Sequence, residues 1–210
     1  MPENVWQILK KIYYLLLKLR YRTIGRPYVR AETSKSYGRR KREGFFEKYC
    51  LGKGIDIGYG GDIVVPGCLG WDFEHGDAQY MRRVKEHSFD FVYSSHTLEH
   101  MFDPSISLIN WWRILRPGGF LIIYIPHRDL YEKKKVLPSK FNPDHKQFFL
   151  LDRDEEPDTI GIVPFVQRTL SGFEILYAKE CDENHTITDP NLHSDGEYSI
   201  EIVIKKNRIK

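Results

Sequence analysis

Short apolar runs that alternate with a longer amphipathic stretch are the feature that most constrains how this chain folds. The runs at residues 54–57, 68–71, 89–94 and 119–125 have the length and apolar character of buried strands, and residues 104–115 follow a helical pattern. Short apolar strands joined by helices favour a parallel sheet that is covered on both faces. We therefore predict an α/β domain with a doubly wound, mostly parallel sheet.

The C-terminal part has a different pattern. Residues 173–179 and 198–204 are longer β-rich runs joined by a polar loop, and a helical stretch at 162–170 precedes them. This arrangement predicts an antiparallel pair that closes the sheet. The segment 127–164 is longer than a connection between a strand and a helix needs, so we interpret it as a lid or acceptor-binding insertion.

The N-terminal arm, residues 1–48, carries most of the basic charge. It holds 13 Lys and Arg against 4 Asp and Glu, a net charge of +9, and the remaining residues carry −6. Residues 5–20 read as an amphipathic helix whose polar face includes Gln7, Lys11 and Lys18. Its apolar run is too short to span a membrane, so residues 4–22 lie on a membrane surface, dock on a partner or pack on their own domain.

Length and cysteine content bound the class of protein. A chain of 210 residues with 41% hydrophobic residues suits one domain, here residues 49–210. Cys50, Cys68 and Cys181 are widely spaced and form no C-x-x-C pair, which argues against a disulfide framework or a structural zinc site. We expect a cytoplasmic protein, peripheral to a membrane if the N-terminal helix binds there.

A glycine-rich turn follows the first predicted strand in "GIDIGYGGD", residues 54–62. Glycine tolerates positive φ and lets the backbone approach a ligand closely. Asp72 ends the next predicted strand, where a carboxylate can accept hydrogen bonds from ribose hydroxyls. Asp77 and Ala78 come next, followed by "SFDFVYSSHTLEHM" and "WWRILRPGGFLIIYIP".

This ordered series resembles the class I S-adenosylmethionine-dependent methyltransferases, in particular small-molecule enzymes of the ubiquinone-biosynthesis type. The resemblance implies a Rossmann-like sheet of seven strands with an antiparallel last strand, and S-adenosylmethionine as the cofactor. It also implies which residues hold each part of the cofactor. Asp56, Gly58 and Gly60 would line the methionine part, and Asp72 would hold the ribose. Asp77 with Ala78 would reach the adenine, and Ser94 would contact the amino group.

Asp62 departs from the family pattern, which has a glycine at this place. A carboxylate that pointed inward would repel the carboxylate of the cofactor. The alternative interpretation of Asp56 and Asp72 is that they are strand-end or capping acids without a cofactor.

Histidines concentrate where ligands bind in an open α/β sheet, at the carboxyl ends of the strands. Methyl transfer from a sulfonium requires an aligned acceptor and removal of its proton, and histidine accepts protons near neutral pH. On this strand assignment, seven of the eight histidines lie in loops or insertions that leave the carboxyl ends of strands, and only His87 does not. The seven are His75, His96, His100, His127, His145, His185 and His193.

Three interpretations of "HTLEH", residues 96–100, stay open. His96, Glu99 and His100 face the same way in a helical turn. His100 or His96 is a general base that Glu99 orients, or the three residues bind a divalent metal, or Glu99 and His100 cap the loop. The resembling enzymes have an acidic residue in place of His96 and are associated with magnesium, whereas histidine suits zinc or other transition metals.

The segment 141–149, "FNPDHKQFF", adds aromatic rings beside Asp144 and His145, a further candidate catalytic residue. Such a combination suits a sugar or another small polar ring, and the alternative is that its Phe residues rejoin the core. His193 in the last loop either closes over the acceptor or is only part of a turn.

Three functions are compatible with the sequence. The first is an O-methyltransferase for a small hydroxylated acceptor, with a sugar of a surface glycan or its precursor preferred. The second is an RNA or protein methyltransferase that uses the basic run at residues 39–42 to hold a polyanion, although no N/D-P-P-Y/F motif is present and nucleic acid is not the expected partner. The third is a non-catalytic partner protein with a methyltransferase-like domain.

Overall fold

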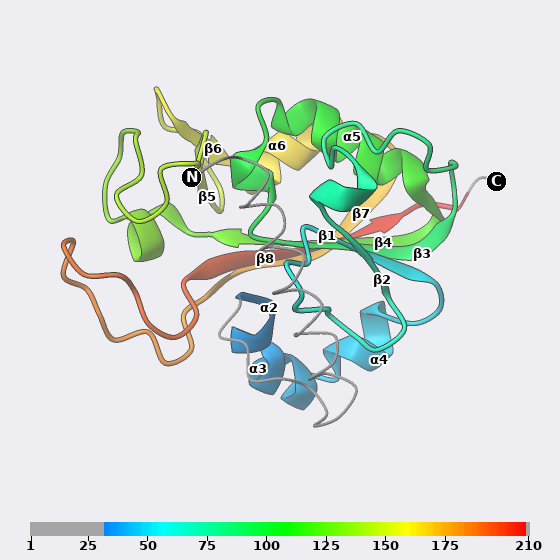
Figure 1. Cartoon of the computed structure of the whole chain (residues 1–210), viewed down its shortest axis with the longest axis horizontal. Coiled ribbons are helices and arrows are strands. Elements are labelled where there is room, and N and C mark those ends of the chain that lie inside the picture. Colours follow the sequence, from blue (N-terminus) through cyan, green and yellow to red (C-terminus); the bar gives the residue numbers. More distant parts are fainter. Residues whose placement is uncertain (1–31, 209–210) are drawn as a thin grey trace.

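The structure of the chain is a computed structural model, and it describes residues 32–208. The predicted amphipathic helix and its contact with a membrane surface through residues 4–22 lie outside the described residues. Within them, no helix combines the length and the apolar composition needed to cross a bilayer. The described chain has three layers, with a central sheet between two groups of helices (Figure 1).

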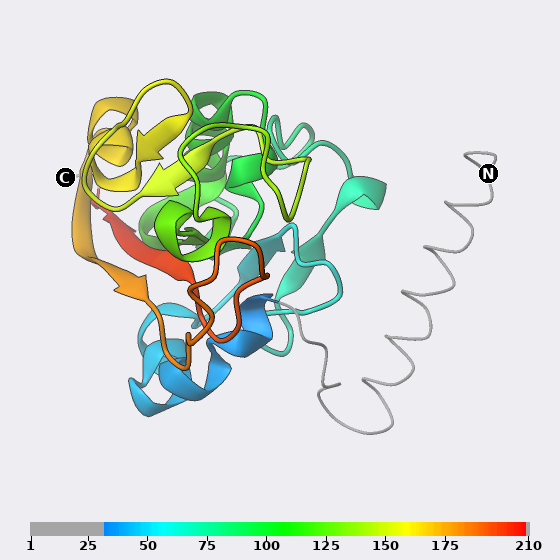
Figure 2. The same cartoon turned by 90° about the vertical axis from the view of Figure 1, so that its left-hand side faces the viewer.

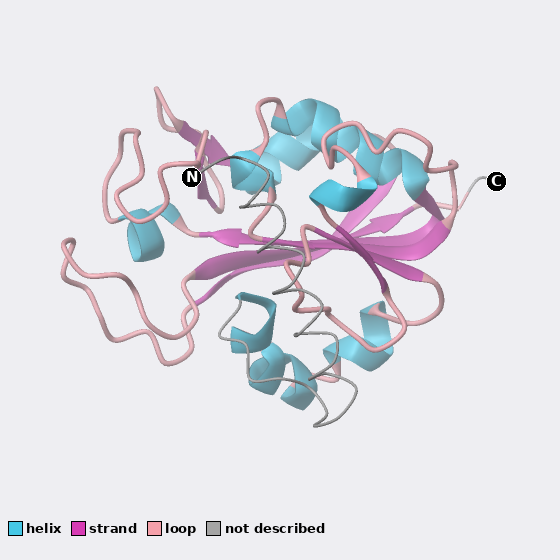
Figure 3. Cartoon of the chain, viewed as in Figure 1, coloured by secondary structure: helices cyan, strands magenta, loops and turns pink. Residues whose placement is uncertain are grey.

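The central sheet, whose strands are magenta in Figure 3, has six strands in the order β2-β1-β3-β4-β8-β7. β8 pairs antiparallel with β4 and with β7, whereas the pairs among β2, β1, β3 and β4 are parallel. The predicted mostly parallel sheet with an antiparallel last strand is therefore confirmed. The strands are β1 Gly54–Ile57, β2 Leu69–Trp71, β3 Phe89–Ser95, β4 Leu115–Pro126, β7 Phe173–Cys181 and β8 Ser199–Lys206.

The predicted number of seven strands is wrong for the described part of the chain. β2 is an edge strand, and between β2 and β3 the chain makes the 3₁₀ turn η1, Phe73–His75, followed by further turns. Met81, Arg83 and His87 in this segment have φ values of 46, 70 and 53°, which are incompatible with an extended strand. The segment is rich in charged residues and lacks the apolar alternation that would bury a further strand.

Helices cover both faces of the sheet (Figure 1). The predicted helices at 104–115 and 162–170 are confirmed as α5 and α6, which lie on one face. Asp103 begins α5 by accepting hydrogen bonds from the backbone N–H groups of Ser105 and Ile106. On the other face, Gly44 separates α3 from α4 by adopting a φ of 62°. The helices are α2 Glu32–Lys35, α3 Tyr37–Arg42, α4 Phe45–Tyr49, α5 Pro104–Ile114 and α6 Ile162–Thr169.

Alternation along the strands divides the core into two parts, one on each face of the sheet. Ile55 and Ile123 belong to the apolar cluster that includes Trp111 of α5. Tyr93 and Ile122 belong to the cluster that includes Phe45 of α4. Successive side chains of a strand point to opposite faces, so a strand buried on both faces needs apolar residues at nearly every position.

A buried ionic network fixes α3 to β8. Arg40 is fully buried, and its Nε lies 2.6 Å from a carboxylate oxygen of Glu201. Arg39 pairs with the same carboxylate at 3.0 Å and with Glu197 at 2.9 Å, and Arg40 also donates to the hydroxyl of Tyr93. Two of the four charges in the basic run at residues 39–42 therefore hold the fold together. This finding removes much of the support for that run as a polyanion-binding surface.

The 127–164 insertion contains the π-helical turn η3, Arg128–Glu132, and a separate pair of parallel strands, β5 Phe148–Leu150 and β6 Thr159–Gly161. The insertion and the loop between β7 and β8 lie side by side at the same end of the sheet (Figure 2). Lys133 of the insertion donates hydrogen bonds to the carbonyl oxygens of Ile187 and Leu192 in that loop. The assignment of the insertion as a lid and the domain boundary near residue 48 stay predictions.

Candidate functional site

The carboxyl ends of β1, β2 and β3 meet at one edge of the sheet. Ile57 of β1 is in register with Trp71 of β2 on one side and with Ser94 of β3 on the other. Gly58 and Asp72, which directly follow β1 and β2, therefore lie at this edge beside Ser94. The sheet brings together the residues that the resemblance assigns to the cofactor.

The glycine turn packs directly on the histidine-bearing loop. Gly58 has a φ of 73°, and a Cβ added there would lie 1.9 Å from Oγ1 of Thr97. Thr97 also donates a hydrogen bond to the carbonyl oxygen of Ile57. Gly60 has a φ of 54°, and among residues 32–208 no side chain lies within 4 Å of a Cβ built there, which leaves room for a ligand beside the backbone. The predicted cofactor site and "HTLEH" are thus adjacent.

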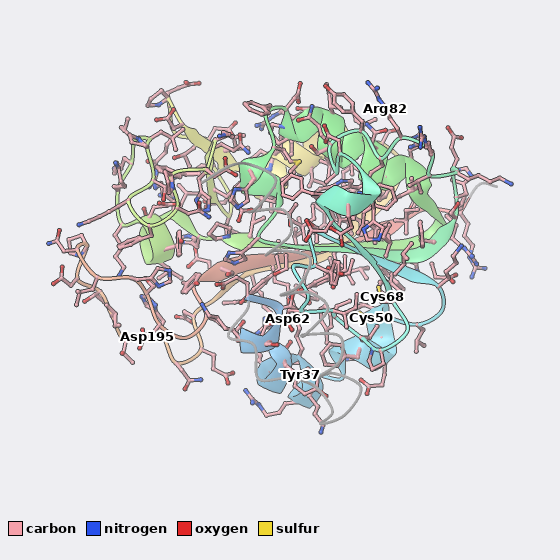
Figure 4. All side chains as sticks on the ribbon, viewed as in Figure 1. Tyr37, Cys50, Asp62, Cys68, Arg82 and Asp195 are labelled. Carbon is pink, nitrogen blue, oxygen red and sulfur yellow. The ribbon has the colours of Figure 1, made fainter. Side chains whose placement is uncertain are left out.

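Asp56 and Asp62, the two acids of the glycine-turn segment, both accept hydrogen bonds from backbone N–H groups. Asp56 is fully buried and accepts a hydrogen bond of 2.7 Å from the backbone N–H of Val64. Asp62 accepts hydrogen bonds from the backbone N–H and the hydroxyl of Ser34 at 2.7 and 2.6 Å, and it lies beside α2 (Figure 4). Asp62, which stands where the resembling family has a glycine, therefore fixes α2 to the glycine turn. Its hydrogen bonds direct the carboxylate toward that helix.

Asp72 and Asp77 shape the chain that follows β2. Asp72 accepts a hydrogen bond from the backbone N–H of Phe73, while the Asp72 N–H donates to the ring of His75, so Asp72 caps η1 as the alternative interpretation proposed. Asp77 accepts from the backbone N–H of Gln79. The carbonyl oxygen of Ala78 accepts from the indole of Trp111 on α5. Both bonds to the aspartates use Oδ1, and Asp72 is thereby fixed directly after β2, at the carboxyl edge of the sheet. The residues present fit the cofactor that the resemblance implies.

Three imidazoles converge on Glu99 beside the glycine turn. Oε1 of Glu99 lies 3.8 Å from Nδ1 of His96, 3.7 Å from Nε2 of His100 and 3.9 Å from Nε2 of His145. Leu98–His100 forms the 3₁₀ turn η2, and His96 before it has a φ of 47°. The sequence placed Glu99 near His96 and His100, and the tertiary fold adds His145 from the insertion.

The carboxylate of Glu99 is buried, and its contacts among the described residues are the three imidazoles at ion-pair distance rather than hydrogen bonds. Its exposed fraction is 0%, and among the described residues neither Oε1 nor Oε2 accepts a hydrogen bond. Its backbone is fixed, since its carbonyl oxygen accepts from the N–H of Lys146 and Gln147 bonds to the carbonyl of Leu98. A buried carboxylate on a hydrogen-bonded backbone therefore faces three imidazoles.

A second layer of acids and hydroxyls orients the imidazoles. Nδ1 of His100 lies 3.0 Å from Asp144, and Nδ1 of His145 lies 2.5 Å from Glu132. When these rings are neutral, donation from Nδ1 to a carboxylate leaves the lone pair on Nε2, and in both rings Nε2 faces Glu99. Nε2 of His96 instead forms a hydrogen bond of 2.8 Å with the hydroxyl of Ser199.

Sequence reasoning identified Asp144 beside His145 but missed Glu132 and Glu32. Glu32 lies on α2, with Oε2 3.7 Å from Nε2 of His96 and Oε1 accepting from Tyr198 at 2.6 Å. No motif marks either glutamate. Their positions depend on how α2 and η3 pack on the sheet.

Burial and charge separate the pKa values of these groups. Burial lowers the pKa of His96, against the opposing effect of Glu32 and Glu99. Burial also acts to lower the pKa of His145, but its hydrogen bond to Glu132 and the charge of Glu99 outweigh this and raise the pKa. The lowered pKa favours the uncharged form of His96 at neutral pH.

Aromatic rings lie next to this cluster. The ring of Tyr131 lies 5.2 Å from that of His193, 5.8 Å from that of Phe141 and 4.9 Å from that of Tyr198. Phe148 and Phe149, predicted as further ring platforms, are instead buried. Both lie in β5, which is buried along its whole length, so the alternative that the Phe residues rejoin the core holds for these two, and Phe141 is the ring that contacts His193.

The three cysteines carry free thiols, in agreement with the prediction that they form no disulfide. Burial raises the pKa of Cys50 and that of Cys181 to about 12. Such thiols are protonated at neutral pH and are poor nucleophiles or metal ligands. They take no part in the site.

Comparisons with known proteins agree with this geometry. Residues 60–123 match the family described as "Methyltransferase domain". A protein of Mycolicibacterium smegmatis, named as a probable S-adenosylmethionine-dependent methyltransferase, is 26% identical over 155 residues. The match covers 64% of this chain and 59% of that relative's length.

Two solved structures share the fold. One, described in work on the conversion of a disulfide bond into a thioacetal group during echinomycin biosynthesis, superposes with a TM-score of 0.53 at 14% identity, covering 83% of this chain and 82% of the other. The other, the [4+2]-cyclase SpnF, gives a TM-score of 0.52 at 13% identity, covering 96% of both chains. At these identities the likeness concerns the fold alone.

Proposed function

We propose that this chain, a class I S-adenosylmethionine-dependent methyltransferase by its domain and fold, methylates a hydroxyl group of a small acceptor. We further propose a sugar of a surface glycan or its precursor as the acceptor class. The observation that carries the proposal is the convergence of three imidazoles on Glu99, directly beside the glycine turn.

The bound cofactor supplies an electrophilic methyl group on a sulfonium. The chain must then hold the acceptor in line with that group and remove the acceptor's proton. Of the two histidines predicted as a base, we favour His96, because its Nδ1 faces Glu99 and its Nε2 contacts the hydroxyl of Ser199, so that the ring is held from both sides. Glu99 would stabilise the imidazolium that forms when His96 accepts the proton.

The rings around Tyr131 support a cyclic acceptor. Phe141 and His193 contribute rings from two different loops, and Glu99 and Glu132 contribute carboxylates nearby. An apolar ring surface next to a few fixed polar groups suits a sugar, which has a C–H face and a rim of hydroxyls.

The test is transfer of a labelled methyl group from S-adenosylmethionine to a panel of sugars, glycan extracts, phenols, RNA and protein. We expect label in a hydroxyl acceptor. In His96→Asn, which retains a side chain that tolerates the left-handed backbone at this position, we expect kcat to fall by about 10²–10⁴ because the proton acceptor is lost.

Three outcomes would contradict the proposal. Label on nitrogen in RNA or protein would favour the second function derived from the sequence. Cofactor binding without any transfer would suggest another reaction on this fold, as in the [4+2]-cyclase. Failure to bind the cofactor would favour a non-catalytic partner protein.

Cofactor binding has its own prediction. Asp72→Asn is expected to weaken S-adenosylmethionine binding about 10- to 100-fold, measured by titration calorimetry, because hydrogen bonds to a charged carboxylate contribute about 1.5–3 kcal/mol. Asparagine caps a helical turn as well as aspartate does, so η1 is expected to remain intact. Glu74→Gln, an exposed acid in the same turn, is the control and should bind as the wild type. Equal affinity in Asp72→Asn would remove Asp72 from the cofactor site.

A further inference from the structure

We infer that Glu99, His100 and His145 bind a first-row transition-metal ion. One ligand atom from each residue can be chosen so that all three lie within 4.8 Å of one another. The sequence-based set of His96, Glu99 and His100 is thereby changed, because His145 takes the place of His96. The metal's part in methyl transfer rests on the proposed function, whereas the binding itself does not.

The distances do not suit direct hydrogen bonds. Nε2 of His100 and Nε2 of His145 lie 3.7 and 3.9 Å from Oε1 of Glu99, beyond the usual limit of about 3.2 Å. Ligand atoms around an ion with bonds of about 2.1 Å are separated by roughly 3–3.5 Å. The two pairs with Glu99 would contract by a few tenths of an ångström, and the third pair, within 4.8 Å, by up to about 1.3 Å, for all three atoms to share one ion, which leaves a fourth position for water or the acceptor.

Burial of Glu99 is the independent observation that points to a ligand. Neither of its carboxylate oxygens accepts a hydrogen bond within the described residues, although the side chain is fully buried. Buried carboxylates are normally paired, hydrogen-bonded or bound to a metal. A cation between Glu99 and the two Nε2 atoms would satisfy the carboxylate.

The second layer has the arrangement found behind metal-binding histidines. Asp144 contacts Nδ1 of His100, and Glu132 contacts Nδ1 of His145. Ser139 in turn donates a 2.5 Å hydrogen bond to Glu132. Carboxylates in this position fix the tautomer and make the opposite nitrogen a better ligand.

The donor set identifies the class of ion. Two imidazole nitrogens and one carboxylate oxygen suit zinc, cobalt or another first-row transition metal. The magnesium implied by the resemblance does not fit, since magnesium prefers oxygen ligands. The ligands come from η2 and from the insertion, so the ion would also tie the insertion to the sheet.

The experiment uses untagged, chelator-treated full-length protein without cofactor or acceptor. We expect one zinc ion per chain by competition with a zinc indicator, and cobalt(II) to give visible d–d absorption. His145→Ala is expected to lose at least 100-fold in zinc affinity, and Glu132→Gln about 10- to 100-fold as an orienting residue. His87→Ala, an exposed histidine away from this edge, is the control and should bind as the wild type.

Absence of zinc and cobalt binding in the wild type would overturn the inference. Unchanged affinity in folded His145→Ala would also overturn it, as would a preference for magnesium. The cobalt spectrum of the wild type keeps the test decisive if a variant fails to fold. Zinc binding with no methyl transfer to any acceptor would leave this inference standing and reject only the proposed function.

Discussion

Glu99→Gln is expected to bind S-adenosylmethionine as the wild type does and to transfer its methyl group about 10²–10⁴ times more slowly. Glutamine has the size of glutamate but lacks the negative charge toward which His96, His100 and His145 are directed. Without that charge, the site loses the group that stabilises an imidazolium or anchors a metal. The measurement is kcat with a saturating acceptor, together with cofactor affinity by calorimetry.

Glu180→Gln is the matched control for this prediction. Glu180 lies on β7 and forms a 3.2 Å contact with His127, so it is also a carboxylate paired with an imidazole, but it lies outside the Glu99 cluster. We expect its kcat within about threefold of the wild type. An equal loss in the two variants would mean that the effect is general, and full activity in Glu99→Gln would exclude Glu99 from the chemistry.

Glu201→Gln is expected to lower the free energy of unfolding by about 3–5 kcal/mol, because it leaves Arg40 and part of Arg39 buried without their counter-charge. For a chain of this length, where 1 kcal/mol shifts the midpoint of thermal unfolding by about 2–4 °C, the midpoint should fall by about 6–20 °C. Calorimetry or circular dichroism would measure it. Glu183→Gln, which breaks the exposed pair with Arg42, should change stability by less than about 1 kcal/mol.

The difference in unfolding free energy between the wild type and Glu201→Gln should also depend on pH. Although burial acts to raise the pKa of Glu201, the charges of Arg40 and Arg39 outweigh it and lower the pKa from 4.5 to about 2. A carboxylate with a lowered pKa stabilises the fold fully above its unfolded pKa and loses this effect as pH falls toward the folded pKa. The gap between wild type and Glu201→Gln should therefore be constant above about pH 5 and shrink between pH 4.5 and 2. A constant gap down to pH 2 would contradict the network.

Local patterns were sufficient to predict most of the elements. The strand at Gly54–Ile57 has the predicted bounds, and α5 and α6 lie where the helical periodicity placed them. Apolar alternation and capping residues such as Asp103 act within a few positions of the chain, so they can be recognised from sequence. The prediction of a seventh strand was wrong because it came from the resemblance alone. The residues between β2 and β3 do not themselves favour a strand.

The sequence also indicated the part of the candidate site that is contiguous in the chain. Gly58, Asp72 and Glu99 each come after a predicted strand. Because parallel strands end at a common edge, the three are expected at the same ligand-binding edge. The side chain of Asp62 was harder to interpret. Its partner, Ser34, is 28 residues earlier and reaches it only through the packing of α2.

By itself, then, the sequence determined a parallel α/β fold of the methyltransferase type and placed Glu99 at its ligand-binding edge. Only the tertiary structure decided which groups surround that carboxylate. His145 and Glu132 arrive from the insertion and Glu32 from α2, at distances set by how these segments dock on the sheet. Local periodicity carries no information about such docking, because the contacts join residues far apart in the chain and depend on side chains that fit together only once the sheet has formed.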